Sequence, residues 1–232
     1  MNNICHLAMT PVEFFAAGRL PEHIAWMACH FSPGNQGLSN LPGQLPPDSV
    51  LILNDSIPPA GHDPVIILTQ LNYLIRELQV ACVLLDFQRP ENPETVKLTA
   101  LLVEYLPCPV CVSPLYAIND CCPVFLPSPL PHQPLEAHIA PWAGREIWLE
   151  LAPDAEKIAV TEAGSAFTPL PPEFSIELPF VDTELCCKYQ TQIQEASVLF
   201  TLYRDRQMLQ QLQQQAATLG ISNCVSLYRH MH

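Results

Sequence analysis

The sequence predicts an α/β protein built on a mainly parallel sheet or barrel. Several short β-like segments are apolar throughout instead of alternating, which is typical of strands covered on both faces. Helical patterns separate some of these segments, and strand–helix–strand repeats favour right-handed crossovers between parallel strands. With 232 residues and 49% apolar content the chain can bury a full core, so we predict a single domain over 1–232.

Seven segments have the length and composition of strands. They are rich in β-branched, aliphatic and aromatic residues, and the 25 prolines cluster where these apolar segments stop. The expected strands cover residues 23–31, 49–55, 81–87, 109–115, 123–127, 146–151 and 224–228.

Three segments have the pattern of amphipathic helices. The first, 64–79, follows Asp63, a favourable N-cap, and begins with a proline. The second covers 93–105. The third, 205–219, starts at an acidic residue and ends before Gly220, a natural C-terminal glycine.

Two segments do not fit this alternation. Residues 132–145 and 152–197 hold polar segments and hairpin-like runs such as KIAVTEAG and FSIELPF. We expect an insertion or β-rich decoration over 152–197.

Composition excludes several classes of partner. Ten Lys and Arg residues stand against 23 Asp and Glu, a net charge of −13, so we expect no nucleic acid and no anionic membrane surface as partners. No segment approaches the roughly 18 apolar residues of a membrane-spanning helix. The first residues lack a secretory signal, which predicts a cytoplasmic protein. No P-loop or G-x-G-x-x-G motif is present, so we expect no cofactor.

The ten cysteines allow two interpretations. Cys108 and Cys111 form a C-x-x-C pair, and the adjacent Cys121 and Cys122 follow, which invites a zinc site. However, the second pair is not spaced for a metal, and Cys111 lies in an apolar run. Free cysteine is among the most buried residue types, so we expect reduced core thiols and no metal.

The segment ACVLLDFQRP, residues 81–90, resembles the fourth-strand region of family 18 glycoside hydrolases, the chitinase-like enzymes that include spore-cortex-lytic N-acetylglucosaminidases. The family motif is D-G-x-D-x-D-x-E, often with an aromatic residue before the glutamate and a proline two places after it. Three residues of the chain match the later part of this motif: Asp86 lies at the last aspartate, Phe87 at the aromatic position and Pro90 at the proline. Gln88 lies at the position of the glutamate. Ala81 and Leu84 replace the earlier aspartates.

The segment LYRDRQMLQQLQQQAATLGISNCVSLYR is similar to the family's closing segment, Y-[DE]-D-x-x-S, a helix, G-L-x-G and a last strand ending in tryptophan. Tyr203 and Asp205 take the leading positions, Gly220 and Ile221 the G-L pair, and Tyr228 replaces the tryptophan. The resemblance covers most of the chain in order and implies a TIM-type (β/α) barrel with an insertion before its last strand. Because such barrels take about 250 residues, we expect one N-terminal strand and helix to be missing or reduced.

In the family, the motif glutamate protonates the glycosidic oxygen while the preceding aspartate orients the acetamido group of the substrate. A glutamine has no dissociable proton near neutral pH, so we predict that residue 88 transfers no proton. Asp86 and Gln88 then form a vestigial catalytic site. The Tyr-Asp pair at the family's sixth strand also has no counterpart in PVFLPSPLP.

Five residues at or near the ends of predicted strands are candidate ligand contacts, because barrel sites lie at that face. They are Asp55, Asp86, Gln88, Tyr116 and Tyr228. Asp55 could equally cap a turn, and the two tyrosines could be core residues.

Three functions remain open. The first is a degenerate family 18-like barrel that binds an N-acetylglucosamine-type carbohydrate or a protein partner. The second is an active hydrolase with relocated carboxylates, Asp86 with Glu150 or Glu162. The third is a structural protein whose barrel mouth is filled by side chains. Strand alternation places Glu146 and Glu150 on one face, which we interpret as a solvated face.

Overall fold

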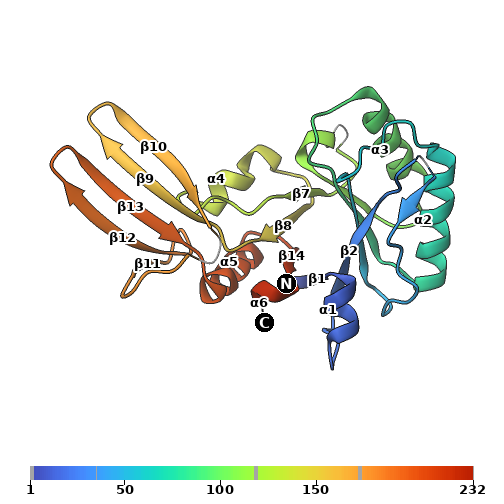
Figure 1. Ribbon diagram of the computed structural model, residues 1–232, viewed down its shortest axis with the longest axis horizontal. Coiled ribbons are helices and arrows are strands. Elements are labelled where there is room, and N and C mark those ends of the chain that lie inside the picture. Colours follow the sequence, from blue (N-terminus) through green and yellow to red (C-terminus); the bar gives the residue numbers. More distant parts are fainter. Residues whose placement is uncertain (1–2, 35, 118–119, 172–173, 232) are drawn as a thin grey trace.

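The computed structural model describes residues 3–34, 36–117, 120–171 and 174–231. These residues contain a closed barrel of eight parallel strands, which confirms the TIM-type fold (Figure 1). The barrel closes because β1 pairs with both β2 and β14. In order around the barrel the strands are β1 (Ile4–Met9), β2 (Ile24–Phe31), β4 (Val50–Asn54), β5 (Cys82–Asp86), β6 (Val110–Val112), β7 (Val124–Leu126), β8 (Ile147–Leu151) and β14 (Asn223–Leu227).

The expectation of a reduced N-terminus is wrong for the strand. β1 is present and pairs along its length with β14, with Ile4 opposite Asn223. The helix that follows, α1 (Pro11–Ala16), has only six residues. It begins with a capping box in which the Thr10 amide donates to Glu13 Oε2 at 2.8 Å and the Glu13 amide donates to Thr10 Oγ1 at 3.2 Å.

The three predicted helices are present within one residue of their expected bounds. They are α2 (Pro64–Leu78), α3 (Pro93–Tyr105) and α5 (Arg206–Thr218). Each begins at a side-chain cap: Asp63 accepts from the Val65 amide at 2.9 Å, and Asn92 and Asp205 play the same part for α3 and α5. A short helix, α6 (Tyr228–Met231), follows β14.

The chain fits a barrel into 232 residues by shortening its connections. In its described residues, the link from β2 to β4 holds only β3 (Leu38–Ser39), which pairs antiparallel with β2. The described part of the link from β6 to β7 contains a single 3₁₀ turn, η1 (Pro114–Tyr116). Between β7 and β8 lie the short helix α4 (Leu135–Ile139) and the turn η2 (Ala140–Trp142).

A five-stranded antiparallel sheet lies between β8 and α5 in the chain and projects from one side of the barrel (Figure 1). Its strand order is β10-β9-β13-β12-β11. The strands are β9 (Ala155–Thr161), β10 (Gly164–Leu170), β11 (Phe180–Asp182), β12 (Cys187–Gln194) and β13 (Ser197–Tyr203). The sheet therefore continues to residue 203, beyond the predicted segment 152–197.

The barrel interior is a packed core. One buried cluster contains a residue from each of the eight strands, among them Ala8, Ile52, Leu84, Phe125 and Trp148. The helices pack on the outer faces of the strands in two further clusters. The interior is thus filled by side chains below the strand ends, as in other barrels of this type.

The cysteines form no disulfide in the described residues, and most of them are buried in these cores. Cys82 and Cys111 lie in the barrel interior, where burial raises the pKa of the Cys82 thiol to about 12. In the described parts of the chain, no three His, Cys, Asp or Glu side chains gather as a metal site would require. None of the described helices has the length and hydropathy needed to cross a bilayer.

Candidate functional site

Two adjoining cavities, each of about 440 Å³, open at the carboxyl ends of the barrel strands. They share four lining residues, Asp86, Gln88, Phe125 and Glu150. The first cavity extends over β4, β14 and β1, and the second extends over the loop after β6. The mouth of the barrel is therefore hollow at the face where barrel enzymes build their sites.

Asp86 and Gln88 meet in this mouth. Asp86 follows the interior residue Leu84 by two positions, so strand alternation directs it into the barrel. The Gln88 side-chain amide donates a hydrogen bond to Asp86 Oδ1 at 3.0 Å. Burial raises the pKa of Asp86, the hydrogen bond from Gln88 opposes that shift, and the nearby charge of Asp55 adds to it.

Glu150 is the second carboxyl group of the mouth. It lies in β8 two residues after Trp148, which belongs to the interior cluster. The interpretation of this strand face as solvated is therefore wrong for Glu150, which lines the mouth inside the barrel, whereas Glu146 is exposed. Burial raises the pKa of Glu150 to about 7, a backbone hydrogen bond from Ser128 lowers it, and the charges of Asp86 and Asp154 raise it further.

Asp55 lies at the edge of the first cavity and anchors the loop that carries Gln88. Its carboxylate accepts the backbone amides of Gln88 at 3.1 Å and Arg89 at 2.8 Å. In return, Arg89 Nε donates to the Asp55 carbonyl at 2.7 Å. With both oxygens engaged and the residue 5% exposed, Asp55 positions this loop.

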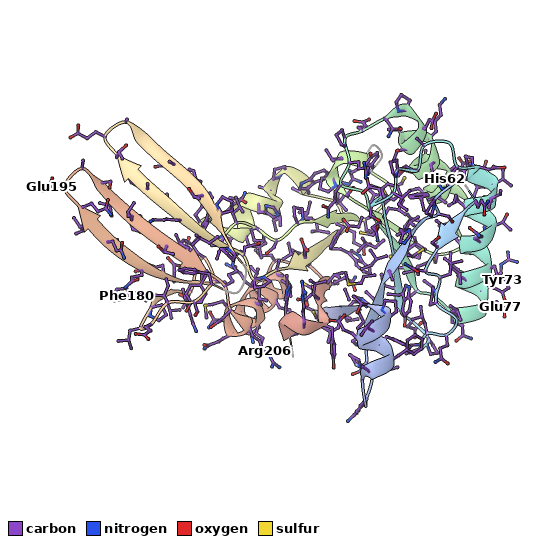
Figure 2. All side chains as sticks on the ribbon, in the orientation of Figure 1. His62, Tyr73, Glu77, Phe180, Glu195 and Arg206 are labelled. Atoms are coloured by element: carbon purple, nitrogen blue, oxygen red, sulfur yellow. The ribbon has the colours of Figure 1, made fainter. Side chains whose placement is uncertain are left out.

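The structure places the remaining candidates away from the mouth. Tyr116 is buried, and its hydroxyl donates to the Arg89 carbonyl at 3.2 Å. Tyr228, at the start of α6, is half-buried against the outer core. Neither is among the described lining residues of the two cavities. Glu162 lies with Glu195 at the tip of the five-stranded sheet. Figure 2 shows that Glu195, and with it this tip, is far from the barrel.

Solved structures with this architecture are found by structural comparison, although no family model and no curated protein matches the sequence. A mutant GH18 chitinase from Cycas revoluta in complex with (GlcNAc)4 matches with a TM-score of 0.60 and 11% identity, covering 97% of this chain and 95% of that chain. The Bacillus cereus spore cortex-lytic enzyme SleL matches with a TM-score of 0.57 and 10% identity, covering 97% and 70%. A chitinase from Chromobacterium violaceum matches with a TM-score of 0.56 and 8% identity, covering 90% and 87%. The chain has the fold of family 18 glycoside hydrolases.

The eight barrel strands can be numbered in chain order and compared with the strands of the family 18 fold. β5 is the fourth barrel strand, so Asp86 and Gln88 stand at the end of the strand that the resemblance assigns to the family motif. β7 is the sixth strand and is followed by Pro127 and Ser128, where the family has a Tyr-Asp pair. The fold is thus shared with these structures.

Sequence reasoning missed much of the apolar wall of the mouth. Met27, Ile52, Leu115, Pro127 and Leu227 line the two cavities. The aromatic lining residues in the described part of the chain are Phe87 and Phe125, which are 0% and 9% exposed. A ligand in the mouth would therefore contact mainly aliphatic side chains and not the faces of aromatic rings. The members of the wall come from separate strands and loops, and only the closed barrel brings them together.

Proposed function

We propose that the mouth of this barrel binds an oligosaccharide of the N-acetylglucosamine type. The observation that supports this proposal is the meeting of Asp86 and Gln88 beside an apolar wall in an open cavity. A carboxylate accepts hydrogen bonds from sugar hydroxyls and from an acetamido N–H, and an amide both donates and accepts. Aliphatic side chains suit the acetamido methyl group, so the mouth matches the mixed polarity of such a sugar.

The structural neighbours support the same ligand class. The Cycas revoluta chitinase is seen in complex with (GlcNAc)4 and, in a second structure, with (GlcNAc)3. The protein in the first complex carries a glutamate-to-glutamine substitution. An amide in place of a glutamate is therefore compatible with oligosaccharide binding in a barrel of this fold.

At the position of the family acid, this chain has an amide. Gln88 donates to Asp86 and lines both cavities, which suits it to binding and orientation. It has no dissociable proton near neutral pH, so the family reaction does not run through residue 88. The open mouth also argues against a barrel plugged by its own side chains, which leaves a protein partner as the competing occupant of this face.

Calorimetric titration of the full chain with (GlcNAc)4 tests the proposal. We expect saturable binding, and we expect Asp86→Ala to weaken it by about tenfold or more, since a lost hydrogen bond to a charged group costs about 1.5–3 kcal/mol. Glu162→Gln, an exposed change at the tip of the sheet, is the matched control and should bind as the wild type does. Absence of heat with the wild type, under conditions in which the chain is folded, would sink the carbohydrate proposal.

A further inference from the structure

We propose that Glu150 and Asp86 form a two-carboxylate glycoside hydrolase site across the barrel mouth, in which Glu150 donates the proton that position 88 cannot supply. This inference rests on the proposed function, because it requires the sugar to occupy the mouth. It adds an activity to binding and assigns that activity to β8, the seventh barrel strand, instead of the fourth strand.

The barrel topology places the two carboxyl groups on facing sides of the cavity. β5 and β8 are three strands apart in one direction around the eight-strand ring and five apart in the other. Asp86 and Glu150 both point inward by strand alternation, and both line each of the two cavities. Two carboxyl groups flanking one cavity are the arrangement that most glycoside hydrolases use.

The surroundings of the two groups separate their roles. Glu150 is largely buried among apolar neighbours such as Phe125 and Pro127, which favours its neutral form. The charged groups that face it are Asp86 from β5 and Asp154 after β8, and both disfavour its ionisation. Together with burial they bring the pKa of Glu150 to about 7, in the range that suits a general acid at neutral pH.

Each carboxyl group receives a hydrogen bond: Asp86 from the side-chain amide of Gln88 at 3.0 Å, and Glu150 from the backbone of Ser128. At Glu150 burial outweighs this bond and brings the pKa to about 7. A hydrogen bond donated to a carboxylate stabilises its ionised form. Gln88 therefore serves as the residue that orients Asp86 and keeps it anionic, a role that a glutamate in the same place would oppose by charge repulsion. In this site Gln88 positions Asp86, and Glu150 is the general acid.

The reaction balances with water as the only co-substrate. The Glu150 carboxylic acid gives its proton to the glycosidic oxygen as the bond from that oxygen to the anomeric carbon breaks, and the leaving sugar departs as an alcohol. Water adds to the anomeric carbon from the side of Asp86 and loses a proton to that carboxylate. One glycosidic bond and one water become two sugars with inversion at the anomeric carbon, and solvent returns the proton from Asp86 to Glu150.

The test is turnover of (GlcNAc)4 by the full chain, followed by product analysis, with binding measured in parallel by calorimetry. We expect the wild type to hydrolyse the oligosaccharide and Glu150→Gln to lose about 10²–10⁴-fold of that activity, the usual contribution of general acid catalysis. Because an amide keeps the shape of the side chain, Glu150→Gln should keep the affinity within about threefold. Glu162→Gln is the control and should retain the wild-type rate.

Three further readouts separate catalysis by Glu150 from a structural role. The rate should fall as pH rises through about 7, where Glu150 loses its proton, and it should also fall at low pH, where Asp86 gains one. The released sugar should show the inverted anomer by NMR. Gln88→Glu should lower the rate.

Binding without turnover in the wild type, or full activity in Glu150→Gln, would overturn the inference and leave the proposed function standing. So would a wild type that is inactive while Gln88→Glu is active, because that result would return the acid to the family position. A wild type that does not bind the sugar at all would remove the proposed function and this inference together.

Discussion

At the scale of the residue, Glu150 makes the stability of the protein depend on pH. Its pKa is raised from 4.5 to about 7 on folding, so the folded state holds this proton more tightly than the unfolded state. The contribution of Glu150 to the unfolding free energy therefore falls as pH rises from about 4.5 to about 7, by about 3 kcal/mol at 1.36 kcal/mol per pKa unit. Glu150→Gln removes the titration, so its stability relative to the wild type should grow by about 2 kcal/mol between pH 5.5 and pH 8.

Urea unfolding at these two pH values measures the effect. The exposed substitution Glu162→Gln should shift the unfolding midpoint by the same small amount at both. If the difference in unfolding free energy between Glu150→Gln and the wild type did not change with pH, Glu150 would not hold a proton in the folded protein.

At the scale of the element, the loop after β5 depends on the end of β4. Asp55→Ala removes the carboxylate that accepts from the amides of Gln88 and Arg89, and a lost hydrogen bond to a charged group costs about 1.5–3 kcal/mol. Because the same loop holds Gln88 against Asp86, we expect both the unfolding free energy and the affinity for (GlcNAc)4 to fall. Calorimetry and urea unfolding on one preparation give both values.

The N-cap of α2 provides the matched control for the loop. Asp63→Ala removes one cap hydrogen bond to the Val65 amide and should cost about 0.5–2 kcal/mol. Asp63 is not among the described lining residues of the mouth, so affinity should not change. Equal losses of affinity in the two variants would mean that binding follows global stability and not the position of the loop.

The elements that the sequence predicted well are those whose signals are local. α2, α3 and α5 have a capping side chain at one end and a period of 3.6 residues, both visible in a short window. β1 has no such signal: ICHLAM is short, and its partner β14 lies over 200 residues away in the chain. Alternation placed Glu146 and Glu150 on one face of their strand, but only closure of the barrel turns Glu150 toward the mouth.

At the scale of the whole molecule, the chain passes between the barrel and the five-stranded sheet at Asp154 and Arg204. The Arg204 amide donates to the Asp154 carbonyl at 3.0 Å, so the chain leaves and re-enters the barrel at adjacent points (Figure 1). The Arg204 side chain, 1% exposed, donates to the carbonyls of Leu130 after β7 and Leu185 beside β12. This buried guanidinium ties the base of the sheet to a barrel loop.

The described lining of the mouth comes wholly from the barrel and its loops, and none of it from residues 155–203. Replacing 155–203 by a short Asn-Gly turn should therefore leave the affinity for (GlcNAc)4 within about twofold, measured by calorimetry. The unfolding temperature should fall by several degrees, since Cys186 no longer packs on Leu209 and Leu212 of α5 and Arg204 loses acceptors. If the shortened chain unfolds cooperatively but no longer binds the sugar, then the sheet supplies part of the site and the mouth alone is insufficient.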